Sequence, residues 1–193
     1  MNKERIEDFQ EIMGMQRDSH LALTEYWKQY ELYTSFEYWL MAAFLIAPLI
    51  ILFFKIDKEK IFLVGFYGYS IHIMFGYHDL LGRNLGYWNY PIPLIPHIPG
   101  LALDSSLVPV IFMLIYQWTL NHQKNFYLYS LLAAAIMSFV FKPMLVSLGI
   151  FELQGKANYL YLFISYIIVF LFAKFATAVF LWAQKKYGKA RYL

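Results

Sequence analysis

Apolar and polar residues alternate in long blocks along this chain of 193 residues. Five apolar runs stand out, and the third of them is shorter and more polar than the others. They cover residues 38–54, 61–77, 105–120, 126–141 and 159–183. A helix needs about 20 mainly apolar residues to span a bilayer, with about 17 as the lower limit. The pattern therefore predicts an all-α fold, a polytopic integral membrane protein with about five transmembrane helices.

The first 37 residues have a different pattern, because they are polar and carry eight of the thirteen acidic side chains. Their apolar residues recur at helical spacing, in a stripe that Gln16 and His20 interrupt. The stripe consists of Ile6, Phe9, Met13, Leu23, Trp27 and Tyr30. We interpret this segment as a solvated amphipathic helix that leads into the first span. An arm for a partner or for the membrane surface is the alternative.

These patterns divide the chain into three parts. Residues 1–37 form the polar N-terminal helical segment, residues 38–184 the transmembrane domain, and residues 185–193 a basic C-terminal tail. The acidic N-terminus lacks the apolar core of a signal peptide, so we expect the first span itself to target the chain.

Composition agrees with a membrane protein and excludes several other classes. Hydrophobic residues make up 60% of the chain and the mean hydropathy is +0.46, both outside the range of soluble globular proteins. The sequence has no cysteine, which excludes disulfides, a thiol nucleophile and a thiolate metal site. A net charge of +3, with basic residues scattered beside the predicted spans, gives no surface for nucleic acid. The sequence also lacks a P-loop, a dinucleotide fingerprint, a His-Glu-x-x-His pair and a nucleophile elbow.

Basic residues near the ends of the predicted spans indicate an orientation. Most of them follow the first, third and fifth spans, which share one side of the membrane if there are five spans. They are Lys55, Lys58, Lys60, Lys124, Lys185, Lys186, Lys189 and Arg191. The opposite loops carry only Arg83 and Lys156, apart from Lys142 at the end of the fourth span. Because Lys and Arg favour the cytoplasmic side, we expect the C-terminus in the cytoplasm and the N-terminus outside.

The loop of residues 82–104 concentrates rigid and aromatic residues. Its segment "YPIPLIPHIPG" has a proline at every second or third position from 91 to 99, which forbids a regular helix and favours extended backbone. Irregular backbone cannot face lipid, so we expect this segment to cover the helix ends as a rigid lid over an outward-facing polar pocket. Tyr87, Trp88 and Tyr90 would anchor it among the lipid headgroups.

Ionisable residues beside this loop are expected at one membrane level. Asp79 ends the second span, Asp104 begins the third, and Lys142 lies in the outer half of the fourth. An ionisable side chain within a membrane is costly unless it is paired or hydrated, so it marks a candidate functional site. Lys142 has Asp79 and Asp104 as candidate partners. The alternative is that such an ion pair only holds the helices together.

Further polar residues complete the predicted ligand pocket. They are His72, His78, His97, Tyr116 and Gln117. His72 lies seven residues before Asp79 and therefore projects from the same face of its helix. Tyr116 and Gln117 lie about three turns beyond Asp104 and form the expected floor.

A metal site is a second interpretation of the same region. Its candidate ligands are His78, Asp79, His97 and Asp104, since imidazole and carboxylate suit zinc or another divalent ion. These residues lack close ligand spacing, so we predict no metal, and the sequence identifies no cofactor.

Small residues indicate where helices pack closely. Ala134 and Ser138 are four positions apart, as are Ala173 and Thr177, and such pairs suit contacts within one protomer or between protomers. The expected partners are membrane lipids, with a protein partner or a second copy of the chain as alternatives.

Four segments carry a resemblance to a known family: "FKIDKEK", "HDLLGRNLGYWNYP", "LDSSLVPVIFMLIYQ" and "KPMLVSLGIFEL". With them, nearly the whole chain from residue 26 onward resembles a family of small uncharacterised polytopic membrane proteins of spore-forming Firmicutes. The matching positions include Asp79, Trp88, Asp104 and Pro109. The resemblance implies the same fold and a location in the bacterial plasma membrane, and the family has no established activity to carry over.

The stretch "GYWNYPIPLIPHIPGLALDSSLVPVIFMLIY" is also similar to the small membrane carotenoid (lycopene) cyclases. In these enzymes an aromatic-rich loop precedes an acidic residue that enters a helix, and Asp104 loosely matches that residue. The similarity implies an intramembrane enzyme acting on a lipid or isoprenoid, with Asp79 or Asp104 as general acid.

Three functional hypotheses follow. The leading one is a non-enzymatic binding or interaction module whose outward-facing pocket takes a lipid headgroup, a small ligand or a partner subunit. The second is the enzyme just described. The third is a proton or cation conductor, which needs a polar route to the inner face. For that route the sequence offers only Tyr116, Gln117, Ser138 and Lys174.

Overall fold

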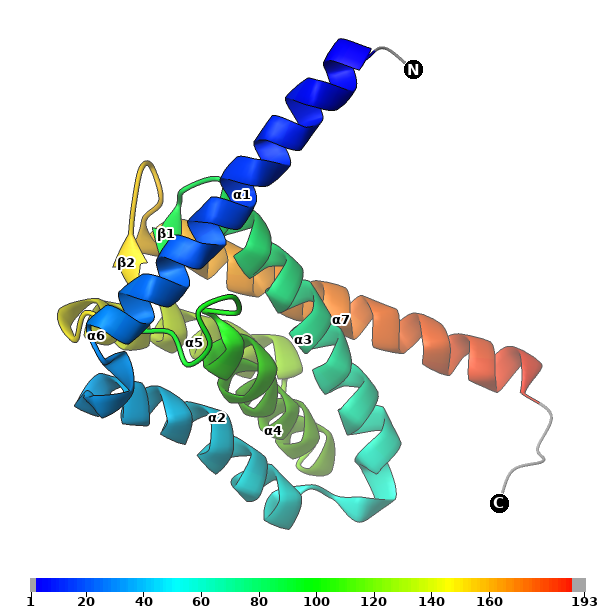
Figure 1. Ribbon diagram of the computed structural model, residues 1–193. Coiled ribbons are helices and arrows are strands. Elements are labelled where there is room, and N and C mark those ends of the chain that lie inside the picture. Colours follow the sequence, from blue (N-terminus) through cyan, green and yellow to red (C-terminus); the bar gives the residue numbers. More distant parts are fainter. Residues whose placement is uncertain (1–2, 189–193) are drawn as a thin grey trace.

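A computed structural model of the protein describes residues 3–188 and confirms the all-α fold (Figure 1). Its α-helices are α1 (Lys3–Gln29), α2 (Phe36–Lys55), α3 (Ile61–Asn84), α4 (Val108–Asn121), α5 (Phe126–Ile136), α6 (Lys142–Ser147) and α7 (Tyr159–Tyr187). Short 3₁₀ turns at Leu32–Thr34 and Lys58–Lys60 precede α2 and α3. The last residues of the predicted basic tail, with Lys189 and Arg191 among them, lie outside the described residues.

Each predicted apolar run lies on a helix. Four helical segments are long and apolar enough to cross a membrane, as expected of a polytopic membrane protein. They are Phe36–Lys55, Leu103–Asn121, Phe126–Ser147 and Tyr159–Tyr187. The remaining run lies on α3, which has 24 residues but a lower hydropathy, because glycine, tyrosine and histidine interrupt its apolar residues. A fifth span through α3 therefore stays a prediction.

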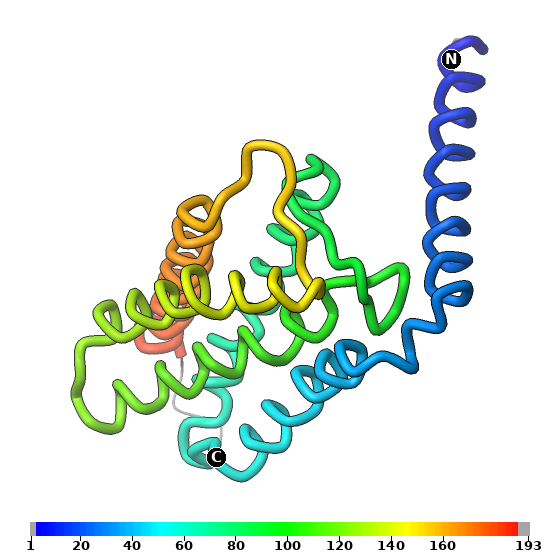
Figure 2. The backbone as a smooth tube through the Cα atoms, turned by 90° about the vertical axis from the view of Figure 1, so that its left-hand side faces the viewer, coloured from blue at the N-terminus to red at the C-terminus, as the bar shows by residue number. Residues whose placement is uncertain are grey.

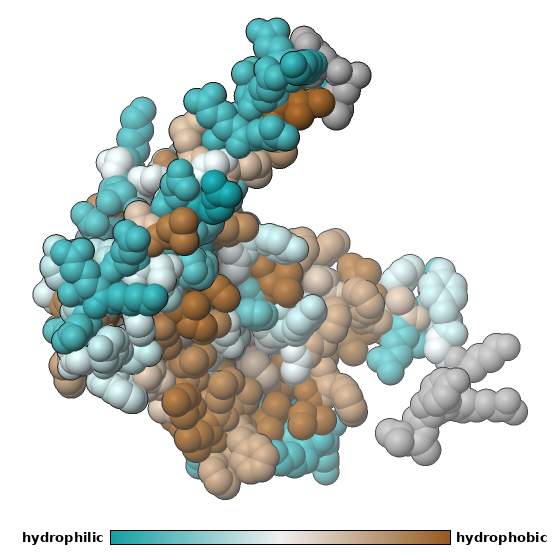
Figure 3. Space-filling model, in the orientation of Figure 1, coloured by the Kyte–Doolittle hydropathy of each residue, from teal (hydrophilic) through white to brown (hydrophobic). Residues whose placement is uncertain are grey.

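The polar helix α1 stands apart from the helix bundle, as Figures 1 and 2 show. None of its residues is buried, and hydrophilic side chains gather on it while apolar side chains gather over the bundle (Figure 3). Its last turns contact the proline-rich loop. There Trp27 Nε1 donates to the Pro93 carbonyl oxygen at 3.1 Å, and Thr24 Oγ1 lies 3.3 Å from His97 Nε2. The end of α1 thus holds the loop from outside the bundle.

From α2 onward the long helical segments run in alternate directions, with α5 and α6 as parts of one segment, and give the bundle two distinct ends (Figure 1). At one end, Gln117 of α4 bonds to the turn that joins α2 and α3. Its side-chain amide accepts from Asp57 N at 2.7 Å and donates to the Lys55 carbonyl oxygen at 2.9 Å. We call residues 55–60 the Asp57 turn. At the opposite end, strands β1 (Trp88–Asn89) and β2 (Glu152–Leu153) pair antiparallel and join the loop after α3 to the loop before α7.

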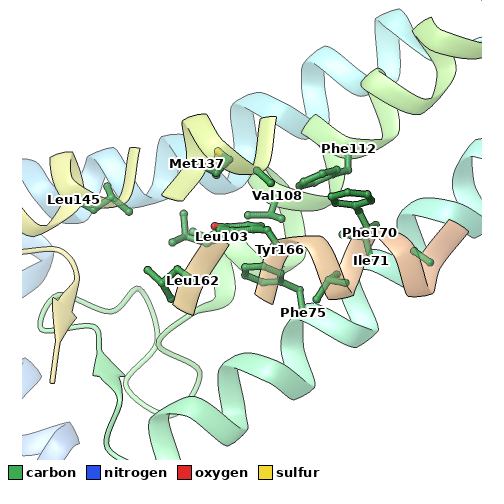
Figure 4. Packing of buried hydrophobic residues seen from close by; sticks show 14 of the residues in the cluster. Ile71, Phe75, Leu103, Val108, Phe112, Met137, Leu145, Leu162, Tyr166 and Phe170 are labelled. Atoms are coloured by element: carbon green, nitrogen blue, oxygen red, sulfur yellow. The ribbon is translucent and has the colours of Figure 1, made fainter. Parts of the chain in front are cut away.

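Aromatic rings and aliphatic side chains pack together in the interior between these ends (Figure 4). Neighbouring centroids lie 5.0 to 6.3 Å apart along a row from Phe75 through Tyr166, Phe112 and Phe170 to Phe126. Aromatic pairs at such distances attract one another beyond the effect of their buried area. The row holds α3, α4, α5 and α7 together.

Two π-helical segments interrupt the long helices, and each ends two residues before a proline. Leu103–Leu107 precedes Pro109, and Met137–Phe141 precedes Pro143. Proline lacks an N–H group and its ring clashes with the carbonyl group four residues earlier, which accounts for a widened turn at this place. The first segment contains Asp104 and the second ends directly before Lys142, so both widened turns position candidate site residues.

Candidate functional site

Ionisable residues that the sequence places at one membrane level lie together inside the structure. Asp79 is on α3, Asp104 on the first π-helical segment, and Lys142 is the first residue of α6. Their exposed fractions are 4%, 8% and 2%. Arg83, one helical turn beyond Asp79, adds a second basic side chain. We call Asp79, Arg83, Asp104 and Lys142 the charge cluster.

Asp79 is bonded through both carboxylate oxygens. Arg83 Nε donates to its Oδ2 at 3.0 Å, while Trp88 Nε1 and the Tyr90 hydroxyl donate to its Oδ1 at 2.9 and 2.7 Å. Burial, and then the neighbouring Asp79 carboxylate, raise the pKa of Tyr90 well above its ordinary value, so this hydroxyl stays a neutral donor. Charge-assisted hydrogen bonds are short and strong. Asp79 therefore ties the proline-rich loop to α3.

Asp104 faces Asp79 beside Gly100 of the loop. A Cβ atom on Gly100 would collide with the Oδ2 atoms of both carboxyl groups, so the close approach of the loop backbone requires glycine. The backbone carbonyl oxygen of Asp104 accepts from His72 Nδ1 at 2.8 Å. In the described part of the chain, Asp104 Oδ1 is buried without a hydrogen-bond partner. Asp104 is thus less fully paired than Asp79.

The Lys142 ammonium lies over aromatic rings. Its Nζ is 3.7 Å from the centroid of the Phe151 ring and 5.4 Å from that of Tyr90, and ring faces attract cations. Within residues 3–188 Lys142 forms no direct ion pair, and the direct partner of Asp79 is Arg83. The expected attraction between Lys142 and the two aspartates acts across a longer distance.

A cavity of about 10 Å³ lies beside the charge cluster. Asp79, Lys142, His78 and Tyr166 contribute to its walls. It has room for about one water-sized group. Among the residues that the structure describes, Tyr166 OH and His78 Nε2 are buried polar atoms without a partner. Because buried polar atoms are normally hydrogen-bonded, the two atoms mark a place where a small polar group would bind.

The cavity is far smaller than the headgroup pocket that we expected, and several predicted pocket residues do not reach it. His97 is exposed beside α1, with its ring centroid 5.4 Å from that of His20. The Tyr116 hydroxyl accepts from Lys174 Nζ at 3.4 Å, deeper in the bundle. The Gln117 side chain accepts a hydrogen bond from the Asp57 turn at the opposite end of the bundle. His72 meets the site only through the backbone of Asp104. The expected floor of Tyr116 and Gln117 is therefore wrong.

The expected headgroup anchors also need correction. Trp88 and Tyr90 are 2% and 6% exposed, because Asp79 accepts their polar hydrogens inside the protein. Tyr87 is half-buried, and its ring lies 5.5 Å from that of Tyr161 on α7. The loop is held by a buried carboxylate and not by its aromatic residues at the headgroups.

The four candidate metal ligands do not converge. His97 lies on the exposed side of the loop, and both oxygens of Asp79 accept hydrogen bonds from protein donors. In residues 3–188 no group of three histidine, aspartate or glutamate residues is placed to hold a metal ion. The arrangement suits a small hydrogen-bonding group.

The sequence reasoning missed three residues of this site. Arg83 lies four residues after Asp79, the spacing at which helical ion pairs form, so a signal for this contact was present. Gly100 had no such signal, because its role depends on two carboxyl groups from other segments. Tyr166 lies in a long apolar run, where its hydroxyl does not stand out from other tyrosines.

No family model, no curated protein and no solved structure matches this chain. The two resemblances drawn from the sequence therefore stay predictions, and the site is interpreted from its own geometry.

Proposed function

We propose that the protein is a non-enzymatic, multi-pass membrane protein that binds an amphipathic ligand and holds the ligand's small polar end beside the charge cluster. One observation carries this proposal. Tyr166 and His78 line a cavity with room for one water-sized group, and in the described residues neither Tyr166 OH nor His78 Nε2 has a hydrogen-bond partner. Leaving buried polar atoms unsatisfied costs free energy, which a ligand that bonds them recovers.

The charge cluster supports binding by closing the site. Asp79 holds Trp88 and Tyr90 of the loop, and Gly100 brings the loop backbone against both carboxyl groups. The loop is therefore a fixed wall of the site. Groups held by packing and hydrogen bonds recognise a ligand without first being ordered, which favours binding.

The enzyme hypothesis has less support in this geometry. A general acid must reach the reacting atom of the substrate. Both oxygens of Asp79 are occupied by donors of the protein, which leaves Asp104 for that role. Asp104 is not among the residues that line the cavity.

The conductor hypothesis needs a polar route from the cavity toward the Asp57 turn. The polar groups deeper in the bundle are Tyr116 and Lys174, which bond to each other. The row of aromatic rings leads from Tyr166 through Phe112 and Phe170 to Phe126, whose ring contacts both members of that pair. Apolar rings at this position oppose the passage of an ion.

We further place the protein in the bacterial plasma membrane, with α3 as the fifth span, the proline-rich loop outside and the C-terminus in the cytoplasm. The lysine residues of the Asp57 turn support this orientation. The chain has no cysteine, so single cysteines can report accessibility. We expect a membrane-impermeant maleimide to label Ile95→Cys in intact cells and Glu59→Cys only in inverted vesicles. The reverse labelling would overturn the orientation.

Native mass spectrometry of the protein extracted gently from its own membrane tests the proposed function. We expect a defined small-molecule adduct on the wild type, with at least about threefold lower occupancy in Tyr166→Phe, which removes one hydrogen bond from the ligand. Tyr67→Phe is the matched control. Tyr67 OH is also buried without a partner in the described residues, but Tyr67 does not line the cavity.

The two variants separate binding from packing. Equal adduct occupancy in Tyr166→Phe and the wild type would place the ligand elsewhere and contradict the proposal. A wild type without any adduct would contradict it as well. Loss of the adduct in both variants would attribute the effect to a general loosening of the bundle.

A further inference from the structure

An apolar groove of about 230 Å³ lies between α3 and α7. Its walls include Tyr77 and Leu81 of α3 and Ile168 of α7, whose exposed fractions are 66%, 57% and 58%. The groove therefore opens to the surroundings of the bundle. Beside helices that cross a membrane, those surroundings are lipid chains.

The groove adjoins the small cavity of the charge cluster. His78 and Ser165 line both the groove and the cavity, so these two side chains form the boundary between them. His78 Nε2 is one of the buried atoms without a partner in the described residues. A chain-like molecule lying in the groove therefore places its end group next to the unsatisfied atoms of the cavity.

We propose that this groove admits a single-chain lipid alcohol sideways from the membrane, with its hydrocarbon chain between α3 and α7 and its hydroxyl in the cavity. This inference rests on the proposed function and names the chemical class of the ligand. The cavity limits the polar end to about one water-sized group, which a hydroxyl fits and a phosphate-containing headgroup exceeds.

Charge and hydrogen-bonding capacity select a hydroxyl among small polar ends. The cavity walls already hold the Asp79 carboxylate and the Lys142 ammonium, so an ionised end group of either sign would be buried beside a like charge. A hydroxyl donates one hydrogen bond and accepts others. Tyr166 OH and a neutral imidazole at His78 can together supply a donor and an acceptor.

The direction of the groove matches the way an amphiphile lies in a bilayer. α3 runs toward the proline-rich loop and α7 runs away from it, so Met74 and Val169 form the deep end of the groove. Leu81, together with the boundary residues His78 and Ser165, lies nearer the loop. The hydroxyl thus sits near the membrane surface, and the chain points toward the midplane.

A photoreactive hexadecan-1-ol with a diazirine in its chain tests this proposal. The probe is added to the full-length protein in phosphatidylcholine vesicles, and the labelled peptides are identified by mass spectrometry. We expect saturable labelling on α3 and α7. Unlabelled hexadecan-1-ol should compete at least about tenfold better than palmitate or hexadecylamine, because either charged end would be buried beside a like charge of the cavity wall.

Two tryptophan substitutions give a matched pair for the groove. Ile168→Trp fills the groove between α3 and α7 and should reduce saturable labelling at least about fivefold, the equivalent of losing the burial of about one methylene group of the bound chain. Leu132→Trp fills a separate apolar groove between α4 and α5, at a residue with a similar exposed fraction of 55%, and should leave the labelling unchanged. Gel filtration of both variants confirms that they are folded.

The outcomes distinguish this inference from the proposed function. If Tyr166→Phe loses its native adduct while Ile168→Trp keeps the adduct and the probe labelling, the lateral route is wrong and the proposed function stands. If palmitate or hexadecylamine competes as well as the alcohol, the neutral end group is wrong. If the wild type has neither saturable labelling nor a native adduct, both the inference and the proposed function fail.

Discussion

The charge cluster and the Asp57 turn use the same local contact at opposite ends of the bundle. Asp79 pairs with Arg83 four residues later at 3.0 Å, and Asp57 pairs with Lys60 three residues later at 2.8 Å. Each aspartate also accepts from a distant neutral donor, Trp88 in the first case and Asn121 in the second. The side chains of Asp79 and Asp57 are 5% and 18% exposed. Similar ion pairs therefore stand in very different surroundings.

The difference decides what each pair contributes. Water and salt screen the pair at the Asp57 turn, so breaking it changes the free energy of unfolding little. Around Asp79, removal of one partner leaves the others buried and unpaired. An acidic residue paired with a basic one on the following turn thus contributes little to stability at one end and a large amount at the other.

Asp79→Ala is expected to have the largest effect. It leaves Arg83, Trp88 and Tyr90 without their acceptor, and loss of one partner of a buried pair costs about 3 to 5 kcal/mol of unfolding free energy. Thermal denaturation in mild detergent, followed by circular dichroism, measures the loss. Asp57→Ala is the control, and similar midpoints for the two variants would remove the contrast between the ends.

Tyr90→Phe should have the next largest effect. It deletes one hydrogen bond to the buried Asp79 carboxylate, worth about 1.5 to 3 kcal/mol of unfolding free energy. Tyr87→Phe changes the same residue type in the half-buried position of the same loop and should be nearly neutral. A midpoint for Tyr90→Phe that equals that of Tyr87→Phe would show that the loop does not depend on this bond.

Gly82→Ala and Gly68→Ala test how rigid α3 is along its length. A Cβ at Gly82 meets the Trp88 ring, which Asp79 holds in place, whereas a Cβ at Gly68 meets the Met113 side chain. Crowding a fixed ring costs about 1 to 3 kcal/mol, while methionine adapts to a new neighbour. We expect a lower midpoint for Gly82→Ala than for Gly68→Ala. The opposite order would mean that Trp88 can move freely.

Asp57→Asn should have the smallest effect, and it should depend on pH. Hydrogen bonds from Lys60 first and then from Asn121 lower the pKa of Asp57 below its ordinary value of 3.8. The ionised form is thus favoured in the folded protein, so its stabilising effect is present above pH 3.8 and is lost as the pH falls through the lowered pKa. The small difference between wild type and variant should therefore disappear in acid. A difference that persists there would assign it to a contact other than the ion pair.

The helical framework could be predicted from the sequence because it depends on local patterns. Each apolar run lies on a helix, and the acidic first segment forms α1 outside the bundle. The close arrangement of Asp79, Asp104 and Lys142 followed from their common level, since helices that cross in alternate directions bring such residues to one end.

The side-chain contacts of the candidate site depend on which helices face each other, and the pattern of a single sequence does not reveal this. We interpreted Trp88 as an interfacial anchor because tryptophan is common at membrane surfaces. Its hydrogen bond to Asp79 joins two different elements, and the sequence gives no signal for such a contact. We assigned Gln117 to the pocket from its distance along the helix beyond Asp104. That distance does not reveal that its side chain bonds to the Asp57 turn. The π-helical segments had a signal in Pro109 and Pro143, whose effect on the preceding turn is local.

The contact between Asp79 and Arg83 also has a consequence for how the protein is made. Both residues belong to one helix, whereas Asp104 and Lys142 are synthesised later in the chain. If α3 enters the membrane as the proposed fifth span, it carries its own counterion out of the translocation channel, which lowers the cost of insertion. The buried site can then be assembled in the order of translation, with each later charge arriving at a place that the first pair has prepared.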